Sequence, residues 1–350
     1  MSTANTPASS SKSVSQGISI VVPCYNEEIS LPKFQSQIVL TMQQVQKEFP
    51  HITYEIVFVN DGSRDKTLEI LQDMCSKAKN IKVLSFSRNF GKEAAILAGL
   101  REASGEGVIL IDADLQDPPH LIIEMVRIWL NSNRTTKVIY ARRTTRAGES
   151  KIRATLSEIF YKLSNLLSEV KIESGVRDFR LMDREVIEAI LELKEYHRFS
   201  KAIFAWVGFK RECLEYEYIP HFKGTSSWSF WNLFKYAIEG IVSFSTAPLR
   251  IAFVLGGLMS IVAVVYGIHR IIDTIVYGNP VAGYPSLMVV ITFIGGIQLM
   301  LLGVIGEYIA RIYEQVKMRP IYILEQFKDK QATQANKKTK ASTTKSNKKD

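Results

Sequence analysis

The stretch from Val108 to Pro119 constrains the fold more than any other part of this 350-residue chain. It begins with Val108-Ile109-Leu110-Ile111, a run of β-formers that is too short for a helix and predicts a buried strand. Acidic residues follow, and Pro118-Pro119 indicates the start of a helix. In open α/β sheets, ligands bind at the carboxyl ends of parallel strands. We therefore expect a ligand site directly after this strand.

Two carboxylates, Asp112 and Asp114, are the main candidates for that site. Carboxylates this close repel each other unless a cation or hydrogen-bond donors lie between them. A hard divalent ion shared with substrate phosphates meets this need. The alternative is a helix cap followed by a solvated turn, and we assign that role to Asp117, which precedes the proline pair.

Short β-branched runs alternate with helix-period segments along the first 141 residues. The predicted strands cover residues 17–22, 54–59, 81–86, 108–111 and 137–141. This alternation predicts a mostly parallel sheet with helices on both faces, and right-handed crossovers then bring the strand ends to one edge. We expect a single crevice that gathers Pro23–Glu27, Asp61, Asp112, Asp114 and Arg142.

Each strand end also has a simpler interpretation. Glu27 could be a first-turn carboxylate that favours the helix dipole, and Asp61 could belong to an Asp-Gly-Ser turn. Acidic groups nevertheless recur at three successive strand ends. This convergence favours a functional site.

Composition and missing motifs exclude several classes. The net charge of +9 lies partly in a Lys-rich tail and does not indicate nucleic acid as a partner. The three cysteines are widely separated, which suits a reducing compartment, and residues 1–16 are polar and do not resemble a signal peptide. We expect the catalytic part in the cytoplasm. Neither a dinucleotide fingerprint nor a P-loop is present.

A carboxylate-held metal on a diphosphate, with acidic groups near a base and ribose, fits an activated sugar nucleotide. Six motifs resemble the polyprenyl-phosphate hexosyltransferases of glycosyltransferase family 2, relatives of bactoprenol glucosyltransferases and dolichyl-phosphate mannose synthase. These motifs lie at residues 21–28, 59–63, 87–95, 112–119, 178–184 and 206–210. The resemblance runs from about residue 17 to 315. It implies a GT-A type, Rossmann-like α/β fold and an inverting transfer.

The resemblance also implies roles for individual residues. Those expected around the nucleotide base and ribose are Pro23, Tyr25, Glu27 and Asp61. Asp112 and Ala113 would line the ribose and diphosphate, and Asp114 and Gln116 would ligate Mg²⁺ or Mn²⁺ beside Asp112. Further candidates are Lys92, Asp178 and Arg198, of which Arg198 would lie near the diphosphate. An Asp–Arg pair such as Asp178 and Arg180 is as often a structural brace.

A basic segment after residue 141 suits an anionic acceptor. Arg153 and Ser157 lie four residues apart and would share one helix face near Arg142. Arginine matches phosphate geometry, although a solvated basic helix near a membrane has the same pattern. The resemblance favours all three as acceptor-phosphate ligands. A phosphate monoester is already ionised near neutral pH, so direct in-line attack on the anomeric carbon needs no strong general base.

Relatives usually carry an Arg-x-x-Gly-x-Ser-Lys segment before the membrane region. In this chain His221 and Ser227 replace the Arg and the Lys, and Lys223 could supply the positive charge. Acceptor contacts are therefore not carried over to this loop.

Two uncharged runs, 251–268 and 281–306, are long enough to span a bilayer. Residues 228–246 have helical apolar spacing, which indicates either a helix in the headgroup region or a buried soluble helix. The positive-inside rule predicts cytoplasmic termini in a multi-pass plasma-membrane protein. The expected organisation is a disordered N-terminus (1–16), a catalytic domain (17–222), an interfacial helix (223–248), a two-helix membrane region (249–310) and a basic tail (311–350).

The leading hypothesis is a membrane glycosyltransferase that moves a hexose onto a polyprenyl phosphate, with glucose from UDP-glucose as the first choice. The alternatives are a mannose synthase that uses GDP-mannose and a non-catalytic lipid-carrier binder. A processive polysaccharide synthase is disfavoured, because no Gln-x-x-Arg-Trp signature occurs and two spans are too few for a conduit. The expected partners are the sugar nucleotide, the polyprenyl phosphate and membrane lipid, with homo-oligomer formation left open.

Overall fold

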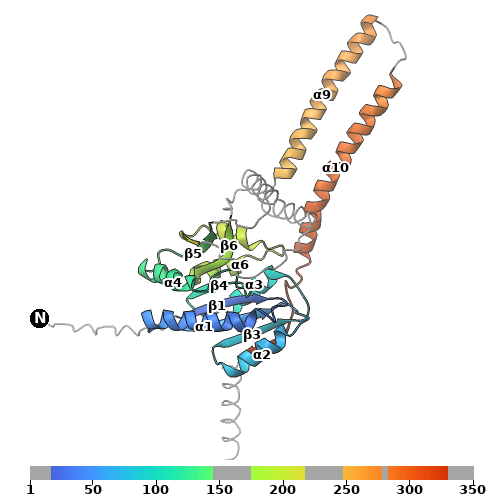
Figure 1. The fold of residues 1–350 in the computed structure, drawn as a ribbon. Helices are drawn as coiled ribbons and strands as arrows, with labels where there is room; N and C mark the ends of the chain where they lie inside the picture. The colour runs from blue at the N-terminus through green and yellow to red at the C-terminus, as the bar shows by residue number, and fades with distance from the viewer. Residues whose placement is uncertain (1–16, 145–174, 217–246, 278–282, 330–350) are drawn as a thin grey trace, which may run out of the picture.

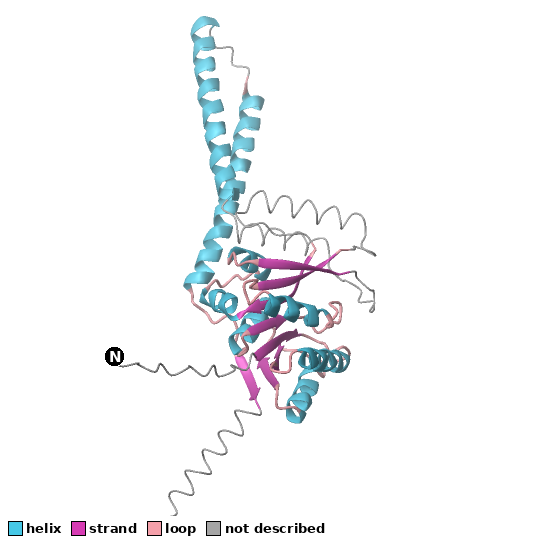
Figure 2. Cartoon of the chain, turned by 90° about the vertical axis from the view of Figure 1, so that its left-hand side faces the viewer, coloured by secondary structure: helices cyan, strands magenta, loops and turns pink. Residues whose placement is uncertain are grey.

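The computed structural model describes residues 17–144, 175–216, 247–277 and 283–329 (Figure 1). An α/β domain forms one end of the molecule, and two long helices project from it (Figures 1 and 2). The predicted interfacial helix lies almost entirely outside the described residues, as do the predicted disordered N-terminus and residues 330–350 of the predicted basic tail.

The core of the domain is an eight-stranded sheet with the strand order β7-β5-β6-β4-β1-β2-β3-β8. Its strands are β1 (Gly17–Cys24), β2 (Thr53–Asn60), β3 (Ile81–Phe86), β4 (Gly107–Leu110), β5 (Val138–Arg143), β6 (Val176–Asp183), β7 (Arg211–Tyr216) and β8 (Leu324–Asp329). β1 pairs in parallel with β2 and β4, β2 with β3, and β5 with β7. The predicted α/β class with a mostly parallel sheet is confirmed.

Helices cover both faces of the sheet. The first face carries α1 (Leu31–Glu48), α2 (Thr67–Lys77) and α4 (Leu121–Asn131), and the second carries α3 (Lys92–Glu102), α6 (Arg184–Glu192) and α7 (Ser200–Trp206). Alternation along β1 sends Ile20 and Val22 to the first core and Val21 to the second. α3 packs so closely on the sheet at Gly99 that a Cβ added there would lie only 2.2 Å from Cγ1 of Val21.

Two antiparallel strands complete the sheet. β6 pairs with both β4 and β5, and β8 pairs with β3 at the sheet edge. Residues 324–329 fall within the predicted basic tail but form β8. This strand is largely exposed and forms through pairing with β3, so the local sequence carries little signal for it.

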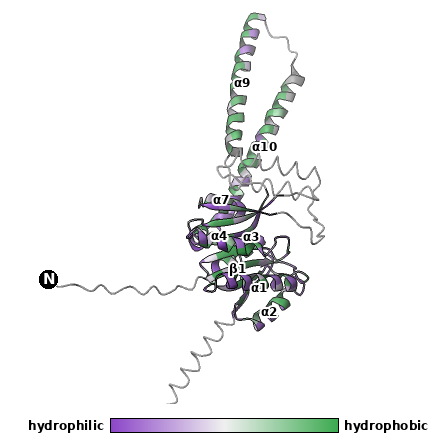
Figure 3. Cartoon of the chain, turned by 60° about the vertical axis from the view of Figure 1, so that its left-hand side comes forward, coloured by the Kyte–Doolittle hydropathy of each residue, from purple (hydrophilic) through white to green (hydrophobic). Residues whose placement is uncertain are grey.

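The C-terminal hairpin consists of α9 (Ala247–Tyr277) and α10 (Tyr284–Val316). Two candidate membrane spans, Ile251–His269 and Phe293–Val316, have mean hydropathies of 2.4 and 1.7, and neither is buried inside the protein. Figure 3 shows the apolar residues along these helices. Exposure distinguishes them from core helices of a soluble domain, which would be buried. The second candidate span begins at Phe293, later than the predicted start at residue 281. Helix α10 continues to Val316, beyond the predicted end of the membrane region at residue 310.

The far end of α10 contacts the catalytic domain. The Gln315 side chain donates to the carbonyl oxygen of Lys194 (2.9 Å) and accepts from the Tyr196 amide (2.8 Å). Just before β8, Tyr322 stacks on Phe86 with 5.0 Å between ring centroids. These contacts tie the hairpin to the sheet at the end of α10.

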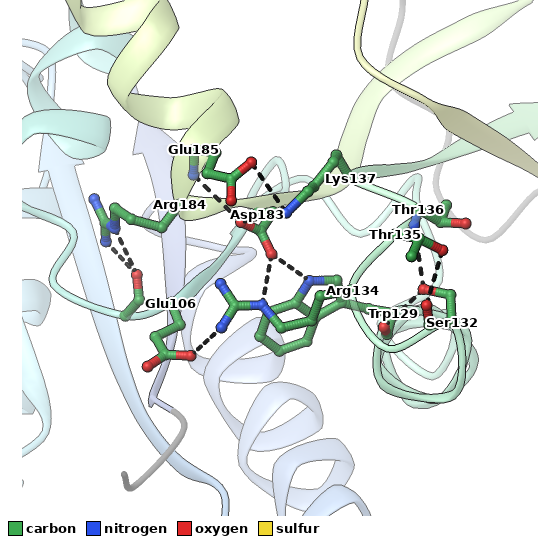
Figure 4. A network of polar contacts seen from close by, with 11 residues as sticks. Glu106, Trp129, Ser132, Arg134, Thr135, Thr136, Lys137, Asp183, Arg184 and Glu185 are labelled. Carbon is green, nitrogen blue, oxygen red and sulfur yellow. Dashed lines mark hydrogen bonds and ion pairs between the residues drawn. The ribbon is translucent and has the colours of Figure 1, made fainter.

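A buried carboxylate at the end of β6 joins this strand to α4 and to the loop that follows α4 (Figure 4). Asp183 is completely buried and accepts hydrogen bonds from Nε1 of Trp129 (2.9 Å) and Nε of Arg134 (2.8 Å). Arg134 also forms an ion pair with Glu106, 2.5 Å apart. This network connects α4, the loop that follows it and β6.

Candidate active site

A cavity of about 390 Å³ opens where β1, β2 and β4 end. Eight of the residues predicted for the site line it: Pro23, Tyr25, Glu27, Asp61, Lys92, Asp112, Ala113 and Asp114. They come from sequence segments up to 91 positions apart (23 to 114) and meet because parallel strands end at the same edge. Asn89 and Gly91, which precede α3, also line the cavity and were not among the predicted site residues.

Asp61 fixes the loop that leads into α3. Its buried carboxylate accepts from the amides of Phe90 (2.7 Å) and Gly91 (3.0 Å). Burial raises the pKa of Asp61 above its ordinary value, and these two amide bonds oppose the rise. The next residue, Gly62, has a φ of +63°, and a Cβ there would lie 2.4 Å from the carbonyl carbon of Arg88. The Asp-Gly turn is therefore both part of the cavity wall and a structural support.

Lys92 connects two of the predicted carboxylates. Its Nζ lies 2.7 Å from Oδ2 of Asp112 and 2.5 Å from Oδ2 of Asp178. Desolvation alone would lower the pKa of Lys92, but the two carboxylates raise it. Desolvation likewise opposes the effect of Lys92 on Asp178, whose pKa falls to about 2. Desolvation prevails at Asp112 and raises its pKa.

Replacing Lys92 with methionine is expected to weaken binding of the sugar nucleotide that the sequence predicts roughly 10- to 100-fold, the effect of losing a charge-assisted hydrogen-bond partner. Asp112 and Asp178 would then face each other without a cation, so both would hold protons to higher pH. In a plot of kcat/KM against pH, the fall in activity on the acidic side should therefore begin at a higher pH than in the wild type. Lys82→Met, which removes an ion pair with Glu55 at 2.8 Å, is the matched control. An unchanged pH profile in Lys92→Met would contradict this role.

The turn after β4 brings Asp114 and Gln116 together. Oδ1 of Asp114 accepts from the Gln116 amide (3.0 Å). Leu115 between them has a φ of +59°, a left-handed conformation that is costly for a residue other than glycine. Such strain often accompanies functional sites. Burial raises the pKa of Asp114, which a nearby cation would offset.

The side-chain oxygens of Asp114 and Gln116 suit a divalent cation that binds together with a nucleotide. The described residues contain no group of three or more His, Cys, Asp or Glu side chains arranged to hold a metal, and Asp112 is already paired with Lys92. Mg²⁺, however, is commonly held by one or two carboxylates together with substrate phosphates and water. The Asp114 carboxylate and the side-chain Oε1 of Gln116 fit that pattern.

The prediction for Asp117 was wrong. Helix α4 begins at Leu121, and the buried Asp117 carboxylate instead accepts from the Tyr216 hydroxyl (2.6 Å) and Nε of Arg177 (3.2 Å). Pro118 and Pro119 have no amide hydrogen to offer, so the carboxylate finds its donors in β6 and β7. These partners lie 60 and 99 positions away in sequence, where local patterns carry no signal.

The predicted acceptor residues are described only in part. Arg142 forms an ion pair with Glu215 of β7 and is not part of the cavity lining, whereas Arg153 and Ser157 lie outside the described residues. Arg198 donates to the carbonyl of Leu193 (2.8 Å) and does not line the cavity. Glu93 was not singled out from sequence and does not line the cavity; its carboxylate accepts from the Ser200 amide (3.0 Å), and burial raises its pKa to about 7.

Comparison with known proteins identifies the chain as a glycosyltransferase. The family model "Glycosyl transferase family 2" matches residues 19–191, and "GtrB C-terminal hairpin" matches residues 247–312. The chain belongs to glycosyl transferase family 2.

The similarity to sequence relatives covers nearly the whole chain. The SfII prophage-derived bactoprenol glucosyl transferase of Shigella flexneri is 45% identical over 308 residues, covering 88% of this chain and 97% of the relative. A prophage bactoprenol glucosyl transferase homolog from Escherichia coli K12 is 43% identical and covers 89% and 99%. Among solved structures, mannosyl-3-phosphoglycerate synthase from Rubrobacter xylanophilus is 18% identical, covers 65% and 73%, and has a TM-score of 0.43.

Proposed function

We propose that this glycosyltransferase moves glucose from UDP-glucose to the phosphate of a polyprenyl carrier, with inversion at the anomeric carbon. One observation carries the proposal: a relative named bactoprenol glucosyl transferase matches 88% of the chain at 45% identity. The hairpin that follows the catalytic domain has a family model of its own. The likeness therefore extends beyond the nucleotide-sugar fold.

The donor would occupy the cavity at the strand ends. Tyr25, Glu27 and Asp61 would surround the base and ribose, and Asp114 with Gln116 would hold Mg²⁺ or Mn²⁺ at the diphosphate. When bound, this cation neutralises charge on the leaving nucleoside diphosphate. Lys92 lines the cavity and would keep Asp112 and Asp178 in place, since it bonds to both of them, although Asp178 itself is not part of the cavity lining.

The acceptor phosphate would be held by Arg142, Arg153 and Ser157. Arg142 is paired with Glu215 in the structure, so binding would require Arg142 to exchange or share this partner. The acceptor oxygen is already ionised near neutral pH and can attack in line. The chain's contribution is then to orient the two substrates and to balance their charge.

The C-terminal hairpin supports a location at the membrane. Basic residues flank its far ends, with Arg250 before the first candidate span and Lys317 and Arg319 after the second. The positive-inside rule therefore favours a catalytic domain and termini on the cytoplasmic side of the plasma membrane. A polyprenyl phosphate could there present its head group to the cavity while its tail stays in lipid.

A donor panel tests the choice of sugar and nucleotide. Purified full-length protein in polyprenyl-phosphate vesicles would receive labelled UDP-glucose, UDP-N-acetylglucosamine or GDP-mannose, and label in the organic extract would be counted. We expect transfer from UDP-glucose at least tenfold above the others, a difference of about 1.4 kcal/mol in transition-state binding. Preferential transfer from GDP-mannose would reject the glucosyl assignment.

A further inference from the structure

Arg177, from β6, contacts the side chain of Gln116. Its Nη2 lies 2.9 Å from Oε1 of Gln116. A guanidinium group has donors and no acceptor, so this contact defines which end of the amide faces Arg177. The amide oxygen accepts one hydrogen bond and retains a second lone pair. That lone pair can bind a cation while Arg177 keeps the amide in one orientation.

The positive charge of Arg177 is balanced by Asp117. Nε of Arg177 lies 3.2 Å from Oδ1 of Asp117, and the Tyr216 hydroxyl donates to the same oxygen at 2.6 Å. Asp117 is 1% exposed, and its other oxygen, Oδ2, has no hydrogen-bond partner among the described residues. Desolvation would lower the pKa of Arg177, but Asp117 raises it, so Arg177 keeps its positive charge. An arginine paired in this way repels a nearby cation less than an unpaired one.

The three residues come from three different elements. Asp117 follows β4, Arg177 lies in β6, and Tyr216 ends β7. A buried carboxylate with an unpartnered oxygen is costly and needs an explanation. Oriented partners behind a metal ligand are common, and their loss typically weakens metal binding 10- to 100-fold.

We propose that Arg177, held by Asp117, whose carboxylate in turn accepts from the Tyr216 hydroxyl, is a positioning residue that orients the Gln116 side-chain oxygen toward a divalent cation bound with the nucleotide diphosphate. The inference rests on the proposed function for the presence of that cation. Arg177 acts through Gln116 and is not assigned a contact with the sugar or the lipid phosphate.

The test measures Mn²⁺ binding to the full-length protein in the presence of UDP, by paramagnetic resonance of free Mn²⁺. Arg177→Gln is expected to raise the Kd for Mn²⁺ about tenfold or more. Tyr216→Phe, which removes only one hydroxyl, should raise it by a smaller factor and keeps the test valid if Arg177→Gln folds poorly. The control is Arg127→Gln, which breaks an ion pair with Glu48 on the outer surface and should leave the Kd unchanged.

A double substitution separates positioning from a general effect. If Arg177 acts through Gln116, Arg177→Gln should have no further effect on the Kd in a Gln116→Ala background. Additive losses in the double variant would overturn the proposal, as would a wild-type Kd in both folded Arg177→Gln and Tyr216→Phe. Mn²⁺ binding does not depend on the acceptor, so failure of lipid transfer in the wild type would reject the proposed function and leave this result standing.

Discussion

Replacing Asp114 with alanine is expected to lower kcat/KM for sugar transfer by about 10²- to 10³-fold, the usual loss when a group that stabilises transition-state charge is removed. Asp114 lines the cavity at the end of β4 and is fixed by the Gln116 amide at 3.0 Å. Without its carboxylate, the Gln116 side chain alone would remain at this turn to hold the cation. Initial rates with the full-length protein in vesicles measure the loss.

The matched control is Asp73→Ala. Asp73 lies on α2 and forms an exposed ion pair with Lys77, four residues along the helix. Such pairs contribute little to stability, so both transfer and folding should be preserved. A wild-type rate in Asp114→Ala would show that this carboxylate is not part of the catalytic machinery.

Asp183→Ala should give the largest loss of stability, about 3–5 kcal/mol in the free energy of unfolding. The substitution leaves Nε1 of Trp129 and the guanidinium of Arg134 without the buried acceptor that both use (Figure 4). Thermal and denaturant unfolding of the protein in detergent measure the effect. Glu48→Ala, which removes the exposed partner of Arg127, should cost under about 1 kcal/mol. Equal losses in the two variants would refute this role of Asp183.

The pH dependence of stability provides a second readout for Asp183. Burial works to raise its pKa, but the bonds from Arg134 and Trp129 lower it below the ordinary value. A depressed folded-state pKa contributes stability that is present above the unfolded pKa, about 3.9, and is lost as the pH falls through the folded value. The stability gap between wild type and Asp183→Ala should therefore narrow below about pH 4.

Much of the parallel sheet could be predicted from sequence because its strands are short apolar runs that end in polar turns. The strand at 81–86 coincides with β3, and the prediction of 54–59 lies within β2. Topology then brings Asp61, Asp112 and Asp114 to one cavity. Strand polarity and connection handedness are general rules, so no knowledge of the side-chain contacts was needed for this part.

The parts that could not be predicted depend on pairing between distant segments. Lys92 and Asp178 are 86 positions apart, and the antiparallel strand β6 brings them together. Asp117 has the local pattern of a helix start, but its partner Tyr216 lies 99 positions away. β8 likewise pairs with β3 across more than 200 residues. Local periodicity does not report such contacts.

The most direct test of the proposed transfer is the structure of its product. The full-length protein would be incubated with UDP-glucose and polyprenyl phosphate in vesicles, and the extracted lipid would be examined by ³¹P and ¹H nuclear magnetic resonance. The proposed function predicts one glucose joined to the lipid phosphate through an inverted, β-configured anomeric carbon, with one UDP released for each glucose transferred. A glucose linked with retained configuration, or released as free sugar without a glycolipid, would contradict it.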